Sequence, residues 1–261
     1  MPFDSSTGIY YQLSGEGANL LLGFPYFASF DEIMPDAIAG TSTRMVEGLA
    51  DRYRVLTLDY PSIGRSRDVP VAELSARRVA ADTLSVADAA GFDRFIYCGY
   101  SWGASVGLQL ARHSDRLEAL AIGAWSPLGA DYAAMLRAAL EQVDDPPPEV
   151  QVVLREPGQY AQWVSYYRSL QDYDERPVLD ALYARGTPCL AFVGAGGDTT
   201  AGSEAVRNAS ILRKAQQALE VLGWQVEFLP HAGHGVGLEP ERVLPLLRKF
   251  LDPLFAAERP L

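Results

Sequence analysis

Short apolar runs rich in Val, Ile, Leu and Tyr alternate with longer amphipathic stretches along most of this 261-residue chain. Runs of that length and composition predict buried strands, and the stretches between them predict helices. A strand, a helix and a second strand in succession form the basic unit of a parallel sheet. We therefore expect an α/β fold, with a mostly parallel central sheet flanked by helices.

The strands expected from this pattern occupy residues 9–13, 19–22, 54–58, 94–98, 117–122, 188–193 and 225–229. The expected helices occupy residues 42–51, 73–90, 102–113, 204–222 and 240–255. The interval 127–185 breaks the alternation, because it has helical apolar spacing, three consecutive prolines and no convincing strand. We therefore expect a helical insertion at 127–185, within a core formed by residues 1–126 and 186–261.

The composition limits the partners of the chain. A formal net charge of −11 would repel nucleic acid and anionic membrane surfaces. The longest apolar runs fall far short of the roughly 20 residues that cross a bilayer, and no secretory leader is visible. Cys98 and Cys189 fall within expected buried strands, where a free cysteine packs as a small apolar residue. We expect a cytoplasmic protein that acts on a small molecule, with no nucleic-acid or membrane partner.

The pattern G-x-S-x-G occurs at Gly99 to Gly103, with Ser101 at its centre. The pattern alone has little weight in a chain with 23 glycines, but here a strand precedes it and an amphipathic helix follows it. The flanking glycines suit a tight turn in which strand and helix approach closely. The helix amides also favour a developing oxyanion. These features predict that Ser101 is a nucleophile rather than only a helix-capping serine.

A serine hydroxyl needs a base within hydrogen-bond reach, and the chain has three histidines. His113 lies about three turns along the helix that Ser101 begins, so it is too far away. His231 and His234 both follow the last expected strand, in a glycine-containing loop at a carboxyl end, where catalytic groups gather in an open α/β sheet. We expect His234 to be the base, with His231 as the alternative. No third Cys or His ligand accompanies the pair, so no metal site is expected.

Asp198 is the carboxylate predicted to orient the histidine. It follows the strand 188–193 in the glycine-rich loop 194–198. In that position it would hold and stabilise the imidazole of His234. The alternative is an aspartate that only closes a turn through its own backbone.

The order Ser101, Asp198, His234 resembles that of the α/β-hydrolase superfamily, and the resemblance runs from about Ile9 to Phe255. It implies that the insertion 127–185 is a cap. It also implies an oxyanion hole formed by the backbone amides of Trp102 and Phe24, since the next residue is a proline without an N–H. The chain departs from the family by carrying Leu22 where many relatives have a histidine, which puts the usual bracing of this loop in question.

Aromatic residues of the insertion have nearly helical spacing and would form the underside of a lid over an apolar pocket, although ordinary packing of a small helical subdomain suits the same spacing. Phe24 and Tyr26 have the same two interpretations, as pocket residues or as core residues. The residues expected to line the substrate pocket are Tyr26, Trp125, Trp163, Tyr166 and Tyr167.

A serine nucleophile favours an acyl-enzyme, so hydrolysis of an ester, thioester or lactone of an apolar small molecule is the expected reaction. No cofactor is required. The same residues suit transfer of the acyl group to an alcohol, amine or peroxide, and cleavage of an activated C–C bond. A non-catalytic protein that binds a small molecule on the same fold is the alternative from a different class. Covalent labelling of Ser101 would separate enzyme from binder.

Overall fold

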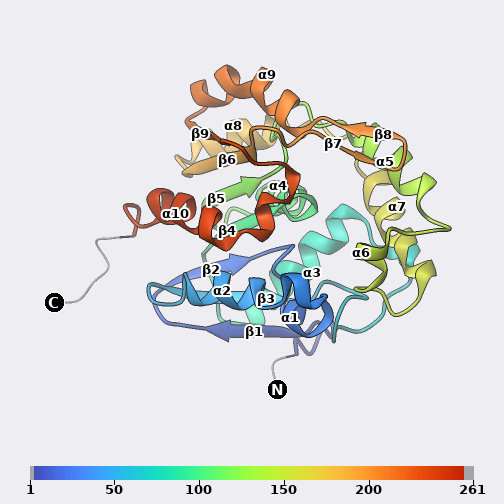
Figure 1. The fold of residues 1–261 in the computed structure, drawn as a ribbon. Coiled ribbons are helices and arrows are strands. Elements are labelled where there is room, and N and C mark those ends of the chain that lie inside the picture. The colour runs from blue at the N-terminus through green and yellow to red at the C-terminus, as the bar shows by residue number, and fades with distance from the viewer. Residues whose placement is uncertain (1–2, 256–261) are drawn as a thin grey trace.

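The computed structural model describes residues 3–255, apart from the side chain of Glu149. Its main sheet has the strand order β1-β3-β2-β4-β5-β6-β9, in which all neighbours are parallel except β1 and β3. The strands are β1 (Tyr11–Ser14), β2 (Ala18–Leu22), β3 (Tyr53–Leu58), β4 (Phe95–Tyr100), β5 (Leu117–Gly123), β6 (Cys189–Gly194) and β9 (Trp224–Leu229). This arrangement confirms the mostly parallel α/β sheet (Figure 1).

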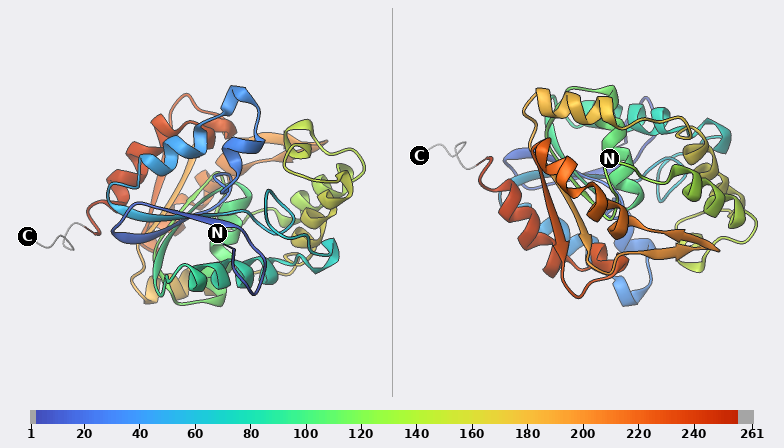
Figure 2. Two further views of the ribbon diagram at one scale, coloured as in Figure 1. Left: turned by 90° about the horizontal axis from the view of Figure 1, so that it is seen from below. Right: turned by 90° about the horizontal axis from the view of Figure 1, so that it is seen from above.

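Helices cover both faces of this sheet, with α2 and α10 together on one face and α3, α4 and α8 on the other (Figure 2). The α-helices are α1 (Phe30–Ile33), α2 (Thr41–Glu47), α3 (Ala76–Ala89), α4 (Trp102–His113), α5 (Tyr132–Glu141), α6 (Pro148–Gln151), α7 (Ala161–Arg168), α8 (Arg176–Ala184), α9 (Asn208–Val221) and α10 (Pro240–Leu251). The 3-10 helices are η1 (Asp36–Ile38), η2 (Val71–Glu73), η3 (Pro157–Tyr160) and η4 (His234–Leu238). No helix in the described part of the chain is both long and apolar enough to span a membrane.

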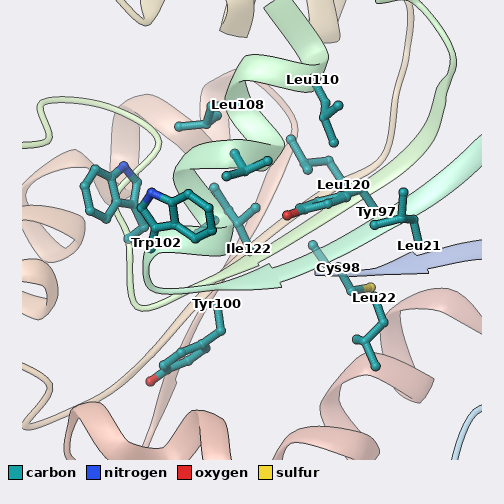
Figure 3. Close-up of a cluster of buried hydrophobic side chains, with 14 of the residues drawn as sticks. Leu21, Leu22, Tyr97, Cys98, Tyr100, Trp102, Leu108, Leu110, Leu120 and Ile122 are labelled. Atoms are coloured by element: carbon teal, nitrogen blue, oxygen red, sulfur yellow. The ribbon is translucent and has the colours of Figure 1, made fainter. Parts of the chain in front are cut away.

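Strand β4 is buried along its whole length, as expected for a central parallel strand covered on both faces. Figure 3 shows Tyr97 beneath α4 among leucines of the neighbouring strands, while Tyr100 points to the opposite side of the sheet. The alternation of side chains along a strand explains this difference. Tyr97 of β4 therefore supports α4, whereas Tyr100 of the same strand reaches the C-terminal segment that contains His234.

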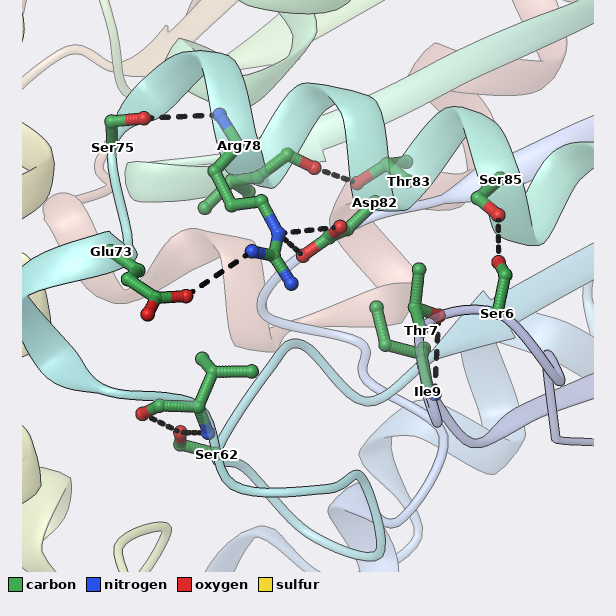
Figure 4. Close-up of polar contacts among 12 residues, drawn as sticks. Ser6, Thr7, Ile9, Ser62, Glu73, Ser75, Arg78, Asp82, Thr83 and Ser85 are labelled. Atoms are coloured by element: carbon green, nitrogen blue, oxygen red, sulfur yellow. Dashed lines mark hydrogen bonds and ion pairs between the residues drawn. The ribbon is translucent and has the colours of Figure 1, made fainter.

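Polar contacts hold the N-terminal segment and α3 in place (Figure 4). Ser75 caps α3 by accepting a hydrogen bond from the backbone of Arg78. The guanidinium of Arg78 donates to Asp82 at 2.8 Å, and the hydroxyls of Ser6 and Ser85 lie 2.7 Å apart. These contacts fix α3 against the chain that leads into β1.

The segment between β5 and β6 contains helices and no strand, as the sequence predicted. Its helices α5 and α7 pack on each other. Helix α5 lies beside a small hairpin formed by β7 (Thr199–Ala201) and β8 (Glu204–Val206) (Figure 1). Helix α8 lies within the expected insertion, but it packs against α4 of the core.

The expected helix 204–222 is wrong in its first residues, because residues 204–206 form β8 and the helix begins at Asn208. Gly202 has φ of +58° and turns the chain between β7 and β8. Both strands are short and β7 is largely exposed, so they lack the apolar alternation that marks a strand in a sequence.

Candidate active site

Ser101 lies at the turn between β4 and α4 with backbone angles φ 53° and ψ −120°, a strained combination for a residue with a side chain. The glycines on either side permit this turn. A Cβ atom on Gly99 would lie 2.6 Å from the carbonyl oxygen of Gly103, and one on Gly103 would lie 2.4 Å from the carbonyl oxygen of Phe24. Close backbone packing therefore presents the Ser101 hydroxyl at the end of the central strand.

His234 opens η4, and its Nε2 lies 3.2 Å from the Oγ of Ser101. This distance suits a hydrogen bond through which the serine proton can pass to the imidazole. Burial lowers the pKa of His234, so the imidazole favours its neutral, basic form. The side chain of His231 is exposed, and its carbonyl accepts a hydrogen bond from Arg242. Of the two candidate bases, the structure brings His234 to the serine.

The structure does not join Asp198 to His234. Both Asp198 carboxylate oxygens accept hydrogen bonds from Ser210, one from its backbone N–H at 2.9 Å and one from its hydroxyl. Partial burial raises the pKa of Asp198, but the hydrogen bonds from Ser210 outweigh this effect, so the pKa lies below its ordinary value. The amides at the start of a helix lack backbone acceptors, which explains why a carboxylate near the start of α9 turns towards them. The Nδ1 atom of His234 is buried and has no hydrogen-bond partner among the described residues.

The two amides expected to form the oxyanion hole differ in their surroundings. Trp102 is the first residue of α4, where a backbone N–H has no acceptor within the helix. The N–H of Phe24 donates to the hydroxyl of Tyr60 at 3.2 Å. The N–H of Trp102 therefore needs no acceptor from its own helix, whereas that of Phe24 already has a partner.

A chain of tyrosine hydroxyls links Phe24 to the helix after Ser101. The hydroxyls of Tyr60 and Tyr97 lie 3.3 Å apart, and that of Tyr97 donates to the carbonyl of Gly103 at 2.7 Å. A Cβ on Gly23 would lie 2.2 Å from the Tyr97 hydroxyl, so the loop before Phe24 passes directly over this chain. The tyrosines therefore brace the loop that carries Phe24, in which Leu22 was expected to leave the usual bracing in question. Sequence reasoning missed them because a tyrosine in or just after an apolar strand resembles a core residue.

The loop that carries His234 is braced by two further tyrosines. The hydroxyl of Tyr100 donates to the carbonyl of His234 at 2.7 Å, and that of Tyr26 donates to the carbonyl of Gly237. From the other side, a Cβ on Gly194 would lie 2.3 Å from the carbonyl oxygen of Gly233. Tyr26, expected to line the pocket, thus braces the histidine loop instead.

Ser101 and His234 open into an apolar cavity of about 370 Å³. Its described lining contains no Asp, Glu, Lys or Arg. Of the expected pocket residues, Trp163 and Tyr167 line it. Sequence reasoning missed many other lining residues, because separate helices bring them together only in three dimensions. These residues are Phe30, Met34, Ile38, Met135, Ala138, Ala139, Gln142, Val150, Val153, Tyr160 and Leu238.

Trp125 and Tyr166 lie outside this cavity. Trp125 faces a separate, polar depression bordered by α5 and α9. Tyr166 packs on the ring of Trp102, with 5.3 Å between ring centroids, and its hydroxyl lies 2.8 Å from that of Ser105. Its role in this structure is to hold α7 against α4.

Comparison with known proteins gives relatives for both the sequence and the fold. The RutD protein of Caulobacter vibrioides (strain NA1000 / CB15N), whose name ascribes carbamate hydrolysis to it, is 32% identical over 157 residues, which are 56% of this chain and 58% of that protein. Across the curated relatives it matches, the chain spans between 32% and 58% of their lengths.

Two solved structures share the fold over nearly the whole chain. A thermophilic esterase from Thermogutta terrifontis has a TM-score of 0.70 at 20% identity, over 95% of this chain and 94% of that one. The enol-lactonase from Burkholderia xenovorans LB400 has a TM-score of 0.67 at 17% identity, over 95% and 97%. The family described as "Alpha/beta hydrolase family" matches residues 23–246 of this chain. The chain is therefore a member of the alpha/beta hydrolase family.

Proposed function

We propose that this protein is a serine hydrolase that cleaves an ester, thioester or lactone of an uncharged, apolar small molecule through an acyl-enzyme on Ser101. The observation that carries the proposal is the 3.2 Å approach of His234 Nε2 to Ser101 Oγ beside an apolar cavity. A nucleophile and a base within hydrogen-bond reach are the minimum for this chemistry.

The reaction follows from the positions of these groups. As Ser101 Oγ attacks the substrate carbonyl, its proton passes to His234 Nε2. The backbone N–H of Trp102 donates to the developing oxyanion, and the Phe24 amide is the second donor, sharing its proton between Tyr60 and the oxyanion. His234 then protonates the leaving group. A water molecule then gives a proton to the same nitrogen as its oxygen attacks the acyl carbon. When the bond between that carbon and Ser101 Oγ breaks, His234 returns the proton to Oγ, which releases the acid and restores Ser101.

The cavity supports an uncharged substrate of moderate size. Its volume of about 370 Å³ lies at the lower end of the range for small-molecule sites. At about 30 Å³ for each non-hydrogen atom, the volume that a water molecule occupies in the liquid, it holds about a dozen such atoms. A buried charge without a partner is costly, and the described lining offers no opposite charge. The cap helices α5 and α7 supply much of this lining.

The names of the relatives agree with this reaction class. Esterase, enol-lactonase and carbamate hydrolase all denote cleavage of a carbonyl carbon from oxygen or nitrogen. The substrates in these names differ, so the relatives support the type of bond cleaved and not a particular compound.

The test combines labelling with turnover. Wild-type protein is treated with a fluorophosphonate probe and its intact mass is measured, while hydrolysis of p-nitrophenyl esters is followed in parallel. We expect one adduct and turnover in the wild type, no adduct in Ser101→Ala, and strongly reduced labelling and turnover in His234→Ala. Well-folded wild type without adduct or turnover would exclude a serine hydrolase and favour a protein that only binds a ligand.

A further inference from the structure

The cavity beside Ser101 has one side-chain amide among its described lining residues, that of Gln142. Gln142 directly follows α5 and lines the cavity together with Met135, Ala138 and Ala139 of that helix. Residues three and four positions apart lie on one helical face. From Met135 to Gln142 this face extends over seven residues, or about 10 Å. The amide therefore ends a face that is otherwise apolar.

Helix α5 leads away from the nucleophile. The N–H of Ser101 donates to the carbonyl of the last residue of β5 at 2.8 Å, so the end of β5 lies beside the nucleophile. The first residue of α5, Tyr132, packs on Trp125 just after β5, with 5.6 Å between ring centroids. The last residue of α5, Glu141, accepts a hydrogen bond at 2.8 Å from a backbone N–H in the turn of the β7-β8 hairpin (Figure 1). Gln142 therefore lies at the end of the cavity remote from Ser101.

A row of aromatic rings connects the nucleophile to this amide. Trp102, next to Ser101, contacts Trp163 with 6.4 Å between ring centroids, and Trp163 contacts Tyr160 at 5.2 Å. The hydroxyl of Tyr160 donates to Oε1 of Gln142 at 2.7 Å. Because Oε1 accepts this bond, the orientation of the amide is fixed, and Nε2 offers its N–H groups as donors.

We propose that Gln142 is a specificity-determining residue that donates a hydrogen bond to an acceptor oxygen near the far end of the acyl chain. The inference rests on the proposed function and narrows its substrate class. The substrate is an uncharged acyl compound that is apolar along most of its chain and carries a carbonyl or hydroxyl oxygen about 10 Å from the scissile carbonyl. Such an oxygen pairs with Nε2, whereas an alkyl end that displaces water from Nε2 leaves a donor unpaired.

The test compares two p-nitrophenyl esters of equal chain length, the octanoate and the 7-oxooctanoate, of which the second has a ketone oxygen near the chain end. The ratio of kcat/KM for the keto ester to that for the octanoate is measured in each variant, so that effects common to both esters cancel. We expect Gln142→Leu to lower the wild-type ratio about five- to tenfold, because leucine removes the donor and extends the apolar face.

Three further variants define the cause of this change. Gln142→Glu keeps an oxygen that can accept from Tyr160 but removes the N–H donors, so the ratio should fall as in Gln142→Leu. Tyr160→Phe removes the hydroxyl that orients the amide and should lower the ratio by a smaller factor. Gln217→Leu is the matched control, because Gln217 is exposed on α9 and lies outside the described lining, so the ratio should equal that of wild type.

The outcomes separate this inference from the proposed function. Wild type that is labelled at Ser101 and cleaves both esters, with the same ratio in Gln142→Leu and Gln142→Glu, would overturn the inference. An equal fall of the ratio in Gln217→Leu would also overturn it. Absence of labelling and turnover in the wild type would instead refute the proposed function.

Discussion

The hydroxyl of Tyr60 accepts a 3.2 Å hydrogen bond from the backbone amide of Phe24. Tyr60 follows β3 and Phe24 follows β2, so the contact joins two strand ends beside Ser101. Through Tyr97 the same network reaches Gly103 in the first turn of α4. The loop that carries Phe24 is therefore held to α4 by the hydroxyls of Tyr60 and Tyr97.

This relationship predicts the effect of Tyr60→Phe. The substitution leaves the Phe24 amide without its partner and frees the loop, so we expect a loss of about 1–2 kcal/mol in the free energy of unfolding. We also expect kcat to fall more than KM changes, because the donor for the oxyanion is less well placed. Urea denaturation and steady-state kinetics measure the two effects. A rise in kcat would show instead that Tyr60 competes with the oxyanion for this amide.

The cavity predicts a dependence on chain length that one substitution should alter. Ala138 lines the cavity from α5, whereas Ala133 on the same helix is exposed. From its capacity of about a dozen non-hydrogen atoms, we expect wild type to prefer esters of about six to eight acyl carbons.

The variant Ala138→Phe should move this optimum to shorter chains and lower kcat/KM for the octanoate at least about tenfold. The acetate should be cleaved at a rate close to that of wild type, and Ala133→Phe should leave the whole series unchanged. A chain-length series of p-nitrophenyl esters makes the comparison. An unaltered optimum in Ala138→Phe would place the acyl chain outside this cavity.

The pH dependence follows from the burial of His234. Burial lowers the pKa of this imidazole below its ordinary value of 6.5. The base is active when neutral, so kcat/KM should persist as the pH falls past 6.5 and decline only as the pH passes through the lowered pKa. A pH profile of kcat/KM gives the inflection of the free enzyme. An inflection above 6.5 would indicate a negative charge near the ring, contrary to the structure.

The nucleophile turn predicts a steric effect at Gly103. A Cβ there would lie 2.4 Å from the carbonyl oxygen of Phe24, so Gly103→Ala forces the two backbones apart. We expect a loss of about 1–3 kcal/mol in stability, as for other overpacked sites, together with reduced turnover. Gly158→Ala is the matched control, because a Cβ at Gly158 meets nothing within 4 Å. Equal thermal unfolding temperatures for the two variants would refute this close approach.

The sequence predicted the fold well where local pattern and tertiary context agree. Strand β4, the serine turn and α4 were found because a wholly apolar run, two glycines and an amphipathic helix leave one reasonable interpretation. The hairpin of β7 and β8 was missed because two three-residue strands, the first of them largely exposed, are too short to carry such a pattern.

The candidate site was predicted less completely, because its supporting contacts join segments that are far apart in the chain. The loop position of Asp198 suits both a contact with His234 and a local turn. Only the placement of α9 shows that Ser210 donates hydrogen bonds to both carboxylate oxygens. Likewise, Tyr60 and Tyr100 lie in or after apolar strands, and nothing local indicates that their hydroxyls reach backbone groups of Phe24 and His234. Polar contacts of this kind depend on tertiary placement rather than on periodicity.

The central claim is that Ser101 becomes acylated during turnover, and mass spectrometry of the quenched enzyme tests it most directly. Wild-type protein turning over p-nitrophenyl octanoate is quenched in acid, and its intact and peptide masses are measured. We predict an octanoyl group on the peptide that contains Ser101, absent in Ser101→Ala and accumulating as a burst with p-nitrophenol release. Turnover that is retained in Ser101→Ala, or an acyl group on another residue, would contradict the account.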